Sequence, residues 1–126
     1  MSASYLVDTD VLVDFLRGVP PAVEFVTRNA DRIALSAIVL SELYAGARED
    51  EIADLDDFVA NLPVLAIGPE IARAAGLLRH RYGKSHGVSL ADALLAATAT
   101  HHGLDVKTLN TKHFPMFNGL QPAYRK

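Results

Sequence analysis

Hydrophobic and polar residues follow two different spacings along this chain. Short apolar runs of a few residues alternate with longer stretches in which apolar side chains recur every three or four residues. The short runs predict β-strands over residues 4–8, 32–35, 63–67 and 105–109. The longer stretches predict helices over residues 10–16, 21–28, 36–48, 52–60, 70–82 and 89–102. Residues 83–88 fit neither spacing and predict a loop, and residues 110–118 predict irregular structure.

The alternation of strands and helices predicts one architecture. Strands that are joined through a helix pair in parallel, because the crossover brings the chain back to start the next strand in the same direction. We therefore expect an α/β fold, a three-layer α/β/α sandwich with a mainly parallel central sheet. The chain has 126 residues, enough for one hydrophobic core and too few for two, so residues 1–126 should form a single domain.

Composition narrows the location and the chemistry. No apolar run approaches the roughly 18 residues of a membrane span, and the first residues lack the layout of a signal peptide. We therefore expect a cytoplasmic protein with no membrane contact. The chain has no cysteine, which excludes disulfides, thiolate metal sites and cysteine nucleophiles. A metal would be held by oxygen or imidazole, and Mg²⁺ or Mn²⁺ suits such ligands.

Charge is unevenly distributed along the chain. The formal net charge is −3, but residues 49–57 contain six acidic residues and no basic one. The rest of the chain has twelve basic and nine acidic residues, so the net charge does not exclude binding to a polyanion. The basic side chains could be solvated helix faces, or they could contact nucleic-acid phosphates. The candidates for such contacts are Arg73, Arg79, Arg81, Lys84, Lys107 and Lys112.

Three candidate site residues, Asp8, Asp92 and Asn110, stand at element ends, where each has an ordinary structural role. Asp8 follows the first strand and could cap the next helix. Ser89 and Asp92 match the spacing of a capping box at the start of the last helix, loosely because Asp replaces the usual Glu. Asn110 follows the last strand and is a common turn residue. Taken singly, each position is explained without any function.

Glu42 has a weaker ordinary explanation. Its spacing from Val39 and Gly46 places it on the apolar stripe of its own helix, so we expect it to be buried. A buried carboxylate without a partner costs several kcal/mol or becomes protonated, whereas a cation would keep it charged. The partner could be an arginine, Arg17 or Arg48, or it could be a metal ion.

Together these four residues predict a metal site. Parallel strands bring Asp8, Asn110 and the helices that carry Glu42 and Asp92 to one edge of the sheet. Two carboxylates about 4 Å apart repel each other by about 4 kcal/mol at an effective dielectric constant of about 20, several times the contribution of a helix cap. The cluster therefore implies a cation, and one or two Mg²⁺ or Mn²⁺ ions there would activate water against a phosphoryl group. The predicted reaction is phosphodiester hydrolysis.

At these residues the chain resembles a known family. Four segments match the motifs of PIN-domain proteins, and in particular of VapC-type toxin ribonucleases from toxin–antitoxin systems. The segments are residues 7–12 (VDTDVL), residues 41–43 (SEL) with Gly46, residues 90–97 (LADALLAA) and residues 108–114 (TLNTKHF). Each motif alone is weak, but four of them in the right order and spacing are specific.

The resemblance carries its own implications. It implies a PIN-like α/β/α fold and a magnesium-dependent endoribonuclease in which Asp8, Glu42 and Asp92 bind the ion. It also implies a homodimer and a cognate, VapB-like antitoxin whose C-terminal segment blocks the site. The substrate would be RNA. Thr9 and Asp10 are expected to hold Asp8 or a metal-bound water.

One departure from the family pattern concerns the fourth acidic position. Many relatives have an acid where this chain has His113, and often another at the position of Asn110. Asn110 can still act in catalysis by supplying an oxygen ligand or by orienting water. His113 could contact phosphate, titrate near neutral pH or pack beside Phe114, and we place it outside the core site.

Two alternative functions stay open at this point. Asp8, Thr9 and Asp10 after a strand are similar to the opening motif of haloacid-dehalogenase-like phosphatases, in which the first Asp is a nucleophile. That family needs further acids at strand ends, whereas Asp56 and Asp57 lie within a helical pattern. The second alternative is a non-catalytic PIN-like module whose acids bind a basic peptide. The endoribonuclease is the hypothesis that the four segments favour.

Overall fold

The central sheet is parallel throughout. The computed structural model describes residues 3–126, and within them four strands form one sheet. The strands are β1 (Tyr5–Val7), β2 (Ile33–Ser36), β3 (Val64–Leu65) and β4 (Asp105–Lys107). Their order across the sheet is β3-β2-β1-β4, and every pair is parallel. β1 therefore lies between β2 and β4, and the predicted α/β class is confirmed.

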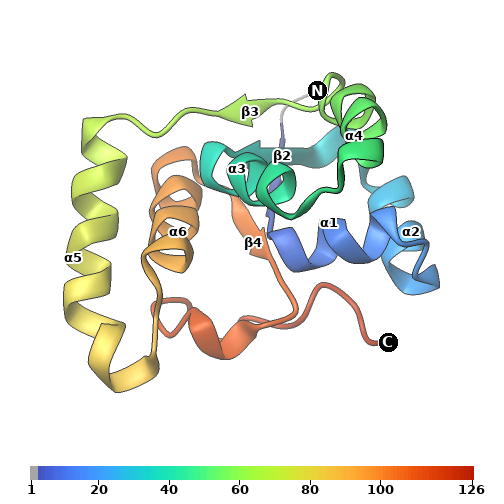
Figure 1. Ribbon diagram of the computed structural model, residues 1–126. Coiled ribbons are helices and arrows are strands. Elements are labelled where there is room, and N and C mark those ends of the chain that lie inside the picture. Colours follow the sequence, from blue (N-terminus) through green and yellow to red (C-terminus); the bar gives the residue numbers. More distant parts are fainter. Residues whose placement is uncertain (1–2) are drawn as a thin grey trace.

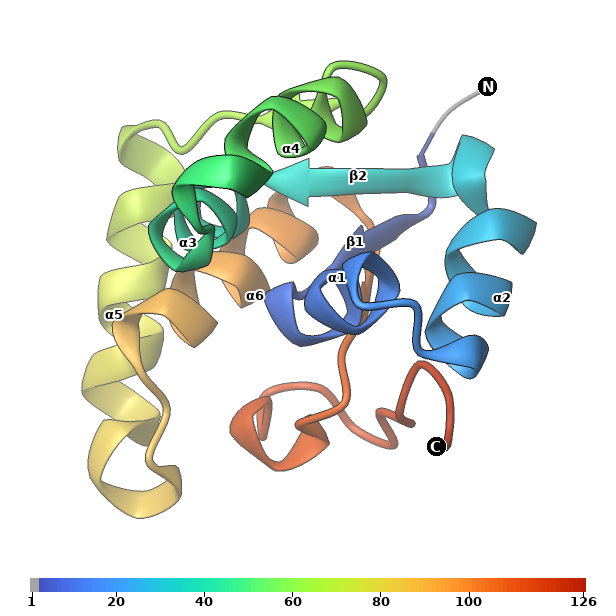
Figure 2. The same cartoon turned by 45° about the vertical axis from the view of Figure 1, so that its right-hand side comes forward.

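Helices flank the sheet to give three layers (Figure 1). Within the same described residues the helices are α1 (Thr9–Leu16), α2 (Pro20–Arg28), α3 (Ala37–Gly46), α4 (Ile52–Val59), α5 (Pro69–His86) and α6 (Leu90–His102). Short 3₁₀ turns cover Ala30–Arg32, Glu49–Glu51 and Thr111–His113. Figures 1 and 2 show α5 beside α6 at one side of the molecule and α1 beside α2 at the other. The expected α/β/α arrangement is confirmed.

The core lies around the two inner strands. Leu6 and Val7 of β1 and Leu35 of β2 are fully buried, as expected for apolar strands covered on both faces. α6 packs closely because its buried side chains include several alanines. In residues 49–57 all six acidic side chains are exposed as expected, while Leu55 between them is buried in the core. Among the described helices, none is long and apolar enough to cross a membrane.

The predicted loop over residues 83–88 is wrong, because α5 continues to His86. Gly83 lies inside the helix, and the guanidinium group of Arg79 covers the position that a side chain on Gly83 would occupy. The helix ends instead at Gly87, whose φ of 63° is left-handed and suits glycine. Val88 then turns into the core with 1% of its surface exposed.

Two strands are shorter than the apolar runs that predict them. The run over residues 63–67 pairs only at Val64–Leu65, and the run over residues 105–109 pairs only at Asp105–Lys107. In β4 the chain leaves the ladder at Thr108, a polar residue that is nevertheless fully buried. The early end of this strand places Thr108 beside the end of β1, at the carboxyl edge of the sheet.

Candidate active site

Asp8 sits directly beyond the end of β1. Its backbone N–H donates to the carbonyl of Lys107 at 2.9 Å, which holds it against β4. One carboxylate oxygen, Oδ1, accepts from the backbone N–H of Thr9 at 2.8 Å, so Asp8 is the cap of α1. The other oxygen, Oδ2, accepts from the Thr108 hydroxyl at 2.8 Å. The capping role is confirmed, and the carboxylate is also fixed by a second donor from β4.

The carboxyl group of Asp8 is difficult to ionise. Burial raises the pKa of Asp8 from 3.8 to about 6, and the nearby charge of Asp10 acts in the same direction. Hydrogen bonds from Thr108 and Thr9 lower the pKa but do not cancel this effect. The charge of Asp92 also raises it, which shows that Asp92 lies within electrostatic reach of Asp8. A cation between these carboxylates would relieve the repulsion.

Asp10 braces the chain that leaves β4. Its Oδ2 accepts from the backbone N–H of Leu109 at 3.0 Å and lies 3.4 Å from the hydroxyl of Thr108. Burial raises the pKa of Asp10 as well. Thr108 thus connects Asp8 and Asp10, although the sequence analysis assigned it no role. The available signal was its position, one residue beyond β4 and therefore opposite the residue that follows β1.

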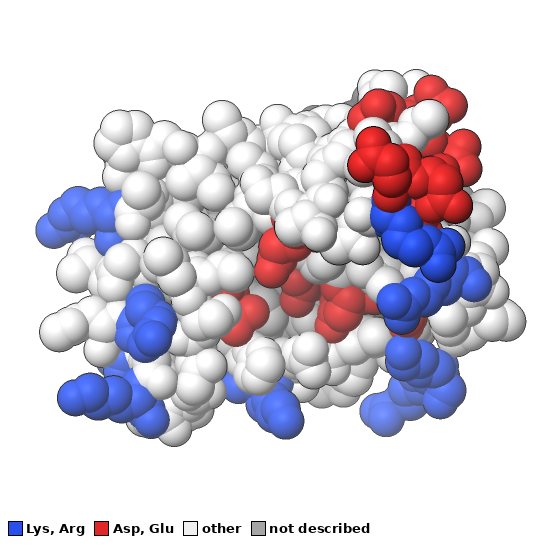
Figure 3. Space-filling model, viewed as in Figure 1, with Lys and Arg blue, Asp and Glu red and all other residues white. Residues whose placement is uncertain are grey.

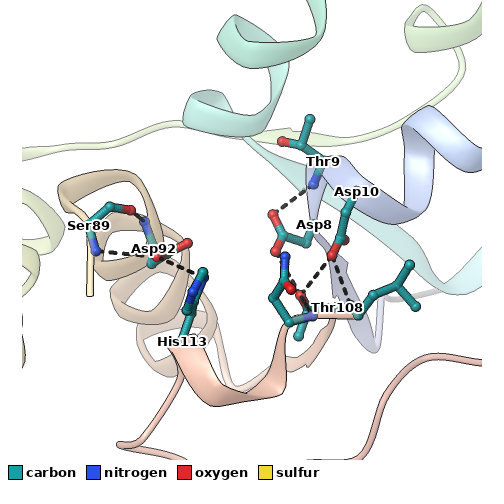
Figure 4. A network of polar contacts seen from close by, with 9 residues as sticks. Asp8, Thr9, Asp10, Ser89, Asp92, Thr108 and His113 are labelled. Carbon is teal, nitrogen blue, oxygen red and sulfur yellow. Dashed lines mark hydrogen bonds and ion pairs between the residues drawn. The ribbon is translucent and has the colours of Figure 1, made fainter. Parts of the chain in front are cut away.

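Asp92 and His113 form the facing wall of the site (Figure 4). Ser89 and Asp92 form the predicted capping box, with Asp92 N–H donating to Ser89 Oγ at 3.0 Å and Ser89 N–H donating to Asp92 Oδ2 at 3.3 Å. His113 Nδ1 lies 3.6 Å from Asp92 Oδ2. The side chain of Asp92 is 19% exposed and that of His113 is 37% exposed. His113, which its sequence position placed outside the core site, therefore lies at the acidic cleft beside Asp92.

Glu42 is exposed, so the prediction that it is buried on the apolar stripe of its helix is wrong. The buried side chains of α3 are Val39 and Leu43, and Glu42 lies at the edge of that stripe. Its Oε1 accepts from the hydroxyl of Thr9 at 2.7 Å, which brings it next to Asp8. Arg48 pairs with two acids of its own segment at 3.6–3.7 Å and not with Glu42. The fold thus brings Glu42 to the site from a solvated position.

Asn110 is exposed at the same edge and has the turn role that its sequence position predicts. Its carbonyl accepts from the backbone N–H of His113 at 3.0 Å, and its own N–H donates to Thr108 Oγ1 at 3.1 Å. These contacts are made by its backbone. A ligand or water-orienting role for its side-chain oxygen stays a prediction.

Basic side chains lie at the edges of the face that contains the acidic cleft. Figure 3 shows red carboxylates in a hollow at the centre of the face and blue side chains around its margins. The exposed basic residues of α5 are Arg73, Arg79, Arg81 and Lys84, and Lys112 is exposed as well. The Lys107 ammonium instead lies 4.6 Å from the centre of the Tyr5 ring. An RNA path along these residues stays a prediction.

The residues of the cleft fit a hard divalent cation. Among residues 3–126, no three acidic or histidine side chains converge closely enough to enclose an ion by themselves. Mg²⁺ does not need such a cage, because it keeps several waters and binds through one or two carboxylates plus substrate phosphates. The donors at hand are carboxylate oxygens on both walls and one imidazole. The pKa of Asp8 is raised first by burial and then by the charge of Asp10, and a bound cation would act in the opposite direction.

Comparison with known proteins identifies the class. The PIN domain family model matches residues 5–116, and the chain therefore belongs to the PIN-domain family. That match ends the phosphatase alternative, and Asp56 and Asp57 indeed lie within α4 and not at strand ends.

Individual relatives agree with the VapC-type resemblance. The chain is 43% identical over 123 residues to ribonuclease VapC19 of Mycobacterium tuberculosis, covering 94% of this chain and 98% of that protein. It is 39% identical to ribonuclease VapC10 of the same organism, covering 94% of this chain and 92% of that protein. Among solved structures, a toxin–antitoxin complex from Klebsiella pneumoniae matches with a TM-score of 0.84 and 27% identity, covering 98% of this chain and 100% of that chain.

Proposed function

We propose that this protein is the toxin endoribonuclease of a toxin–antitoxin pair and that it hydrolyses RNA with a divalent ion, Mg²⁺ or Mn²⁺. The observation that carries the proposal is the cleft in which Asp8, with a pKa of about 6, faces Asp92 across the carboxyl edge of the sheet. The VapC ribonucleases to which the chain is similar over nearly its full length support the same activity. A divalent-metal requirement is in keeping with that family.

Asp8, Glu42 and Asp92 are the residues that would hold the ion. A divalent ion lowers the pKa of water and neutralises charge that develops on a phosphoryl group. The residues of this chain do the rest. Thr108 and the Thr9 N–H orient the Asp8 carboxylate, and the Thr9 hydroxyl orients Glu42. Asn110 would orient the attacking water with its amide oxygen.

RNA would reach the cleft across its basic margin. The exposed side chains of Arg73, Arg79, Arg81, Lys84 and Lys112 can neutralise phosphates on either side of the scissile bond. The acids of residues 49–57 would keep RNA away from their own side by repulsion. Any preference for particular RNAs would then come from RNA shape, because these contacts are made to the backbone.

An antitoxin would inhibit the site from the adjacent groove. Beside Glu42 a groove of about 320 Å³ runs between α1, α3 and α4, and its lining includes Leu16, Leu43 and Leu55. The C-terminal segment of a VapB-like partner could place apolar side chains there and a basic one among the carboxylates. We further propose that the chain acts as one PIN domain, as a homodimer, and in the cytoplasm.

The direct test is cleavage of RNA by the purified, partner-free protein with added Mg²⁺ or Mn²⁺. The wild type should cleave, and Asp8→Asn, Glu42→Gln and Asp92→Asn should each abolish cleavage while leaving the fold intact. Asp57→Asn, which changes an exposed acid on α4 in the same way, is the matched control and should cleave like the wild type.

Two outcomes would contradict the proposal. Cleavage that persists in all three variants would show that these carboxylates are not the site. A wild type that binds metal but leaves RNA intact would favour the non-catalytic binding module.

A further inference from the structure

The C-terminal segment returns to the back of the active site. The PIN-domain match ends at residue 116, and the chain then runs from beyond β4 to α1 and α2 (Figures 1 and 2). On the way, the backbone N–H of Ala123 donates to the carbonyl of Thr108 at 2.9 Å. The segment therefore contacts the backbone of the residue whose hydroxyl orients Asp8. We call residues 122–126 the C-terminal latch.

The latch is anchored on α1 by one buried acid. Asp14 is 8% exposed and accepts from the Tyr124 hydroxyl at 2.8 Å and from the Lys126 ammonium at 2.9 Å. The hydrogen bond from Lys126 lowers the pKa of Asp14, so the acceptor stays ionised. The Tyr124 ring also packs near Phe25 of α2, with 6.2 Å between ring centres. The latch is thus attached to the helix that Asp8 caps.

Thr108 connects the latch to the Asp8 carboxylate, because its carbonyl accepts from the latch and its hydroxyl donates to Asp8. Its hydroxyl has one proton, which it donates to Asp8 Oδ2 at 2.8 Å in preference to Asp10 Oδ2 at 3.4 Å. Thr108 is fully buried, so its hydroxyl direction depends on where its backbone is held. On one side Asn110 N–H donates to the hydroxyl oxygen, and on the other Ala123 N–H holds the carbonyl.

We propose that the C-terminal latch positions Asp8 for catalysis by holding Thr108, with Tyr124 and Asp14 as its anchor. The proposal rests on the proposed function, because the carboxylate that it positions is the one assigned to the metal. These are positioning residues, since neither Tyr124 nor Asp14 belongs to the cleft itself. The alternative is that the latch only stabilises the fold.

A double-mutant cycle separates the two explanations. Tyr124→Phe removes the hydroxyl that bonds Asp14 and keeps the ring, and Thr108→Val removes the donor to Asp8 and keeps the shape. Loss of an outer hydrogen-bonding partner of this kind typically costs about 10- to 100-fold in activity or metal affinity. We expect Thr108→Val to lower kcat by about 30-fold and Tyr124→Phe by about 5-fold, both with an unchanged KM. If the latch acts through Thr108, the double variant should be no slower than Thr108→Val alone.

Affinity for Mn²⁺, measured by calorimetry on the same proteins, is the readout that does not depend on cleavage. It should weaken in Thr108→Val and, by a smaller factor, in Tyr124→Phe. Gln121→Ala, an exposed change just before the latch, is the control and should match the wild type in both measurements. Lys126→Ala, which removes only the ion pair to Asp14, takes the place of Tyr124→Phe if that variant does not fold.

The outcomes distinguish failure of the latch from failure of the proposed function. A wild type that neither binds Mn²⁺ nor cleaves RNA would overturn the proposed function. A wild type that does both, with effects of Tyr124→Phe and Thr108→Val on kcat that multiply in the double variant, would show that Tyr124 does not act through Thr108 and would overturn the latch. An unchanged kcat and Mn²⁺ affinity in Tyr124→Phe would overturn the latch as well.

Discussion

Asp8 costs the folded protein stability at neutral pH. Its pKa rises from 3.8 to about 6 on folding, chiefly through burial and next through the charge of Asp10. Well below pH 3.8 the group is protonated in both folded and unfolded states and imposes no penalty. As the pH rises towards about 6, the unfolded state ionises first and stability falls; above that pH the penalty levels off at about 3 kcal/mol.

The first prediction follows from this penalty. In the metal-free protein, Asp8→Asn should raise the free energy of unfolding by about 1–3 kcal/mol at pH 8 and by nearly nothing at about pH 3. The same variant should lose cleavage. Urea denaturation at the two pH values, followed by circular dichroism, measures the difference. A variant that is less stable than the wild type at pH 8 would show that the Asp8 carboxylate is not strained by burial.

Residue-level prediction succeeded where local spacing carried the information. The capping roles of Asp8 and Asp92 and the turn at Asn110 follow from their positions at element ends. Glu42 lies at the edge of the apolar stripe and not within it, because helical spacing gives a face but not the position at which the neighbouring helices stop covering it. Thr108 was missed because its acceptor, Asp8, is 100 residues away in sequence.

The amino end of α6 combines a structural and a chemical role. Ser89 and Asp92 form the reciprocal capping box, and Asp92 also points into the cleft beside His113. The helix dipole at this end favours the negative charge of Asp92, so the same carboxylate serves the cap and the site. The two roles can be separated, because Ser89 belongs only to the cap.

The second prediction separates those roles. Ser89→Ala should lower the free energy of unfolding by about 1 kcal/mol and leave most of the RNA cleavage. Asp92→Asn should keep most of the free energy of unfolding, because the amide oxygen still accepts from Ser89 N–H. It should lose RNA cleavage, because the charge is lost. Thermal denaturation and a cleavage assay on both variants measure the contrast. Equal losses of cleavage in the two variants would mean that Asp92 matters for the cap alone.

The elements themselves were largely predictable, and their ends were not. Alternating strand and helix spacings located every strand and helix that the structure describes. The end of α5 could not be placed, because Gly83 and Gly87 look alike in sequence and only Gly87 adopts a positive φ. β4 ends at Lys107 because its partner strand β1 ends at Val7, after which Asp8 caps α1.

Acidic and basic side chains occupy different parts of the molecular surface. Carboxylates gather in the central hollow, basic side chains lie around its margins, and the acids of residues 49–57 form a separate cluster (Figure 3). The net charge of −3 is thus compatible with basic side chains at the edges of this face, which could contact phosphates. Whether RNA approaches over the basic residues of α5 stays a prediction.

The whole fold is needed to assemble the site. Asp8 follows β1, Glu42 lies in α3, Asp92 begins α6, and Thr108 follows β4. The parallel order β3-β2-β1-β4 brings these elements to one edge, and no contiguous segment could do so. We propose that these carboxylates, which come from separate segments, act as one cation site.

Calorimetric titration of Mn²⁺ into the metal-free protein is the direct test of whether these carboxylates form one cation site. We expect saturable binding of Mn²⁺ that Mg²⁺ competes away. The affinity for Mn²⁺ should be at least about tenfold weaker in both Asp8→Asn and Asp92→Asn than in the wild type. Asp57→Asn should bind like the wild type. Equal affinity for Mn²⁺ in the wild type, Asp8→Asn and Asp92→Asn would show that these carboxylates do not form a cation site. So would a wild type that does not bind Mn²⁺.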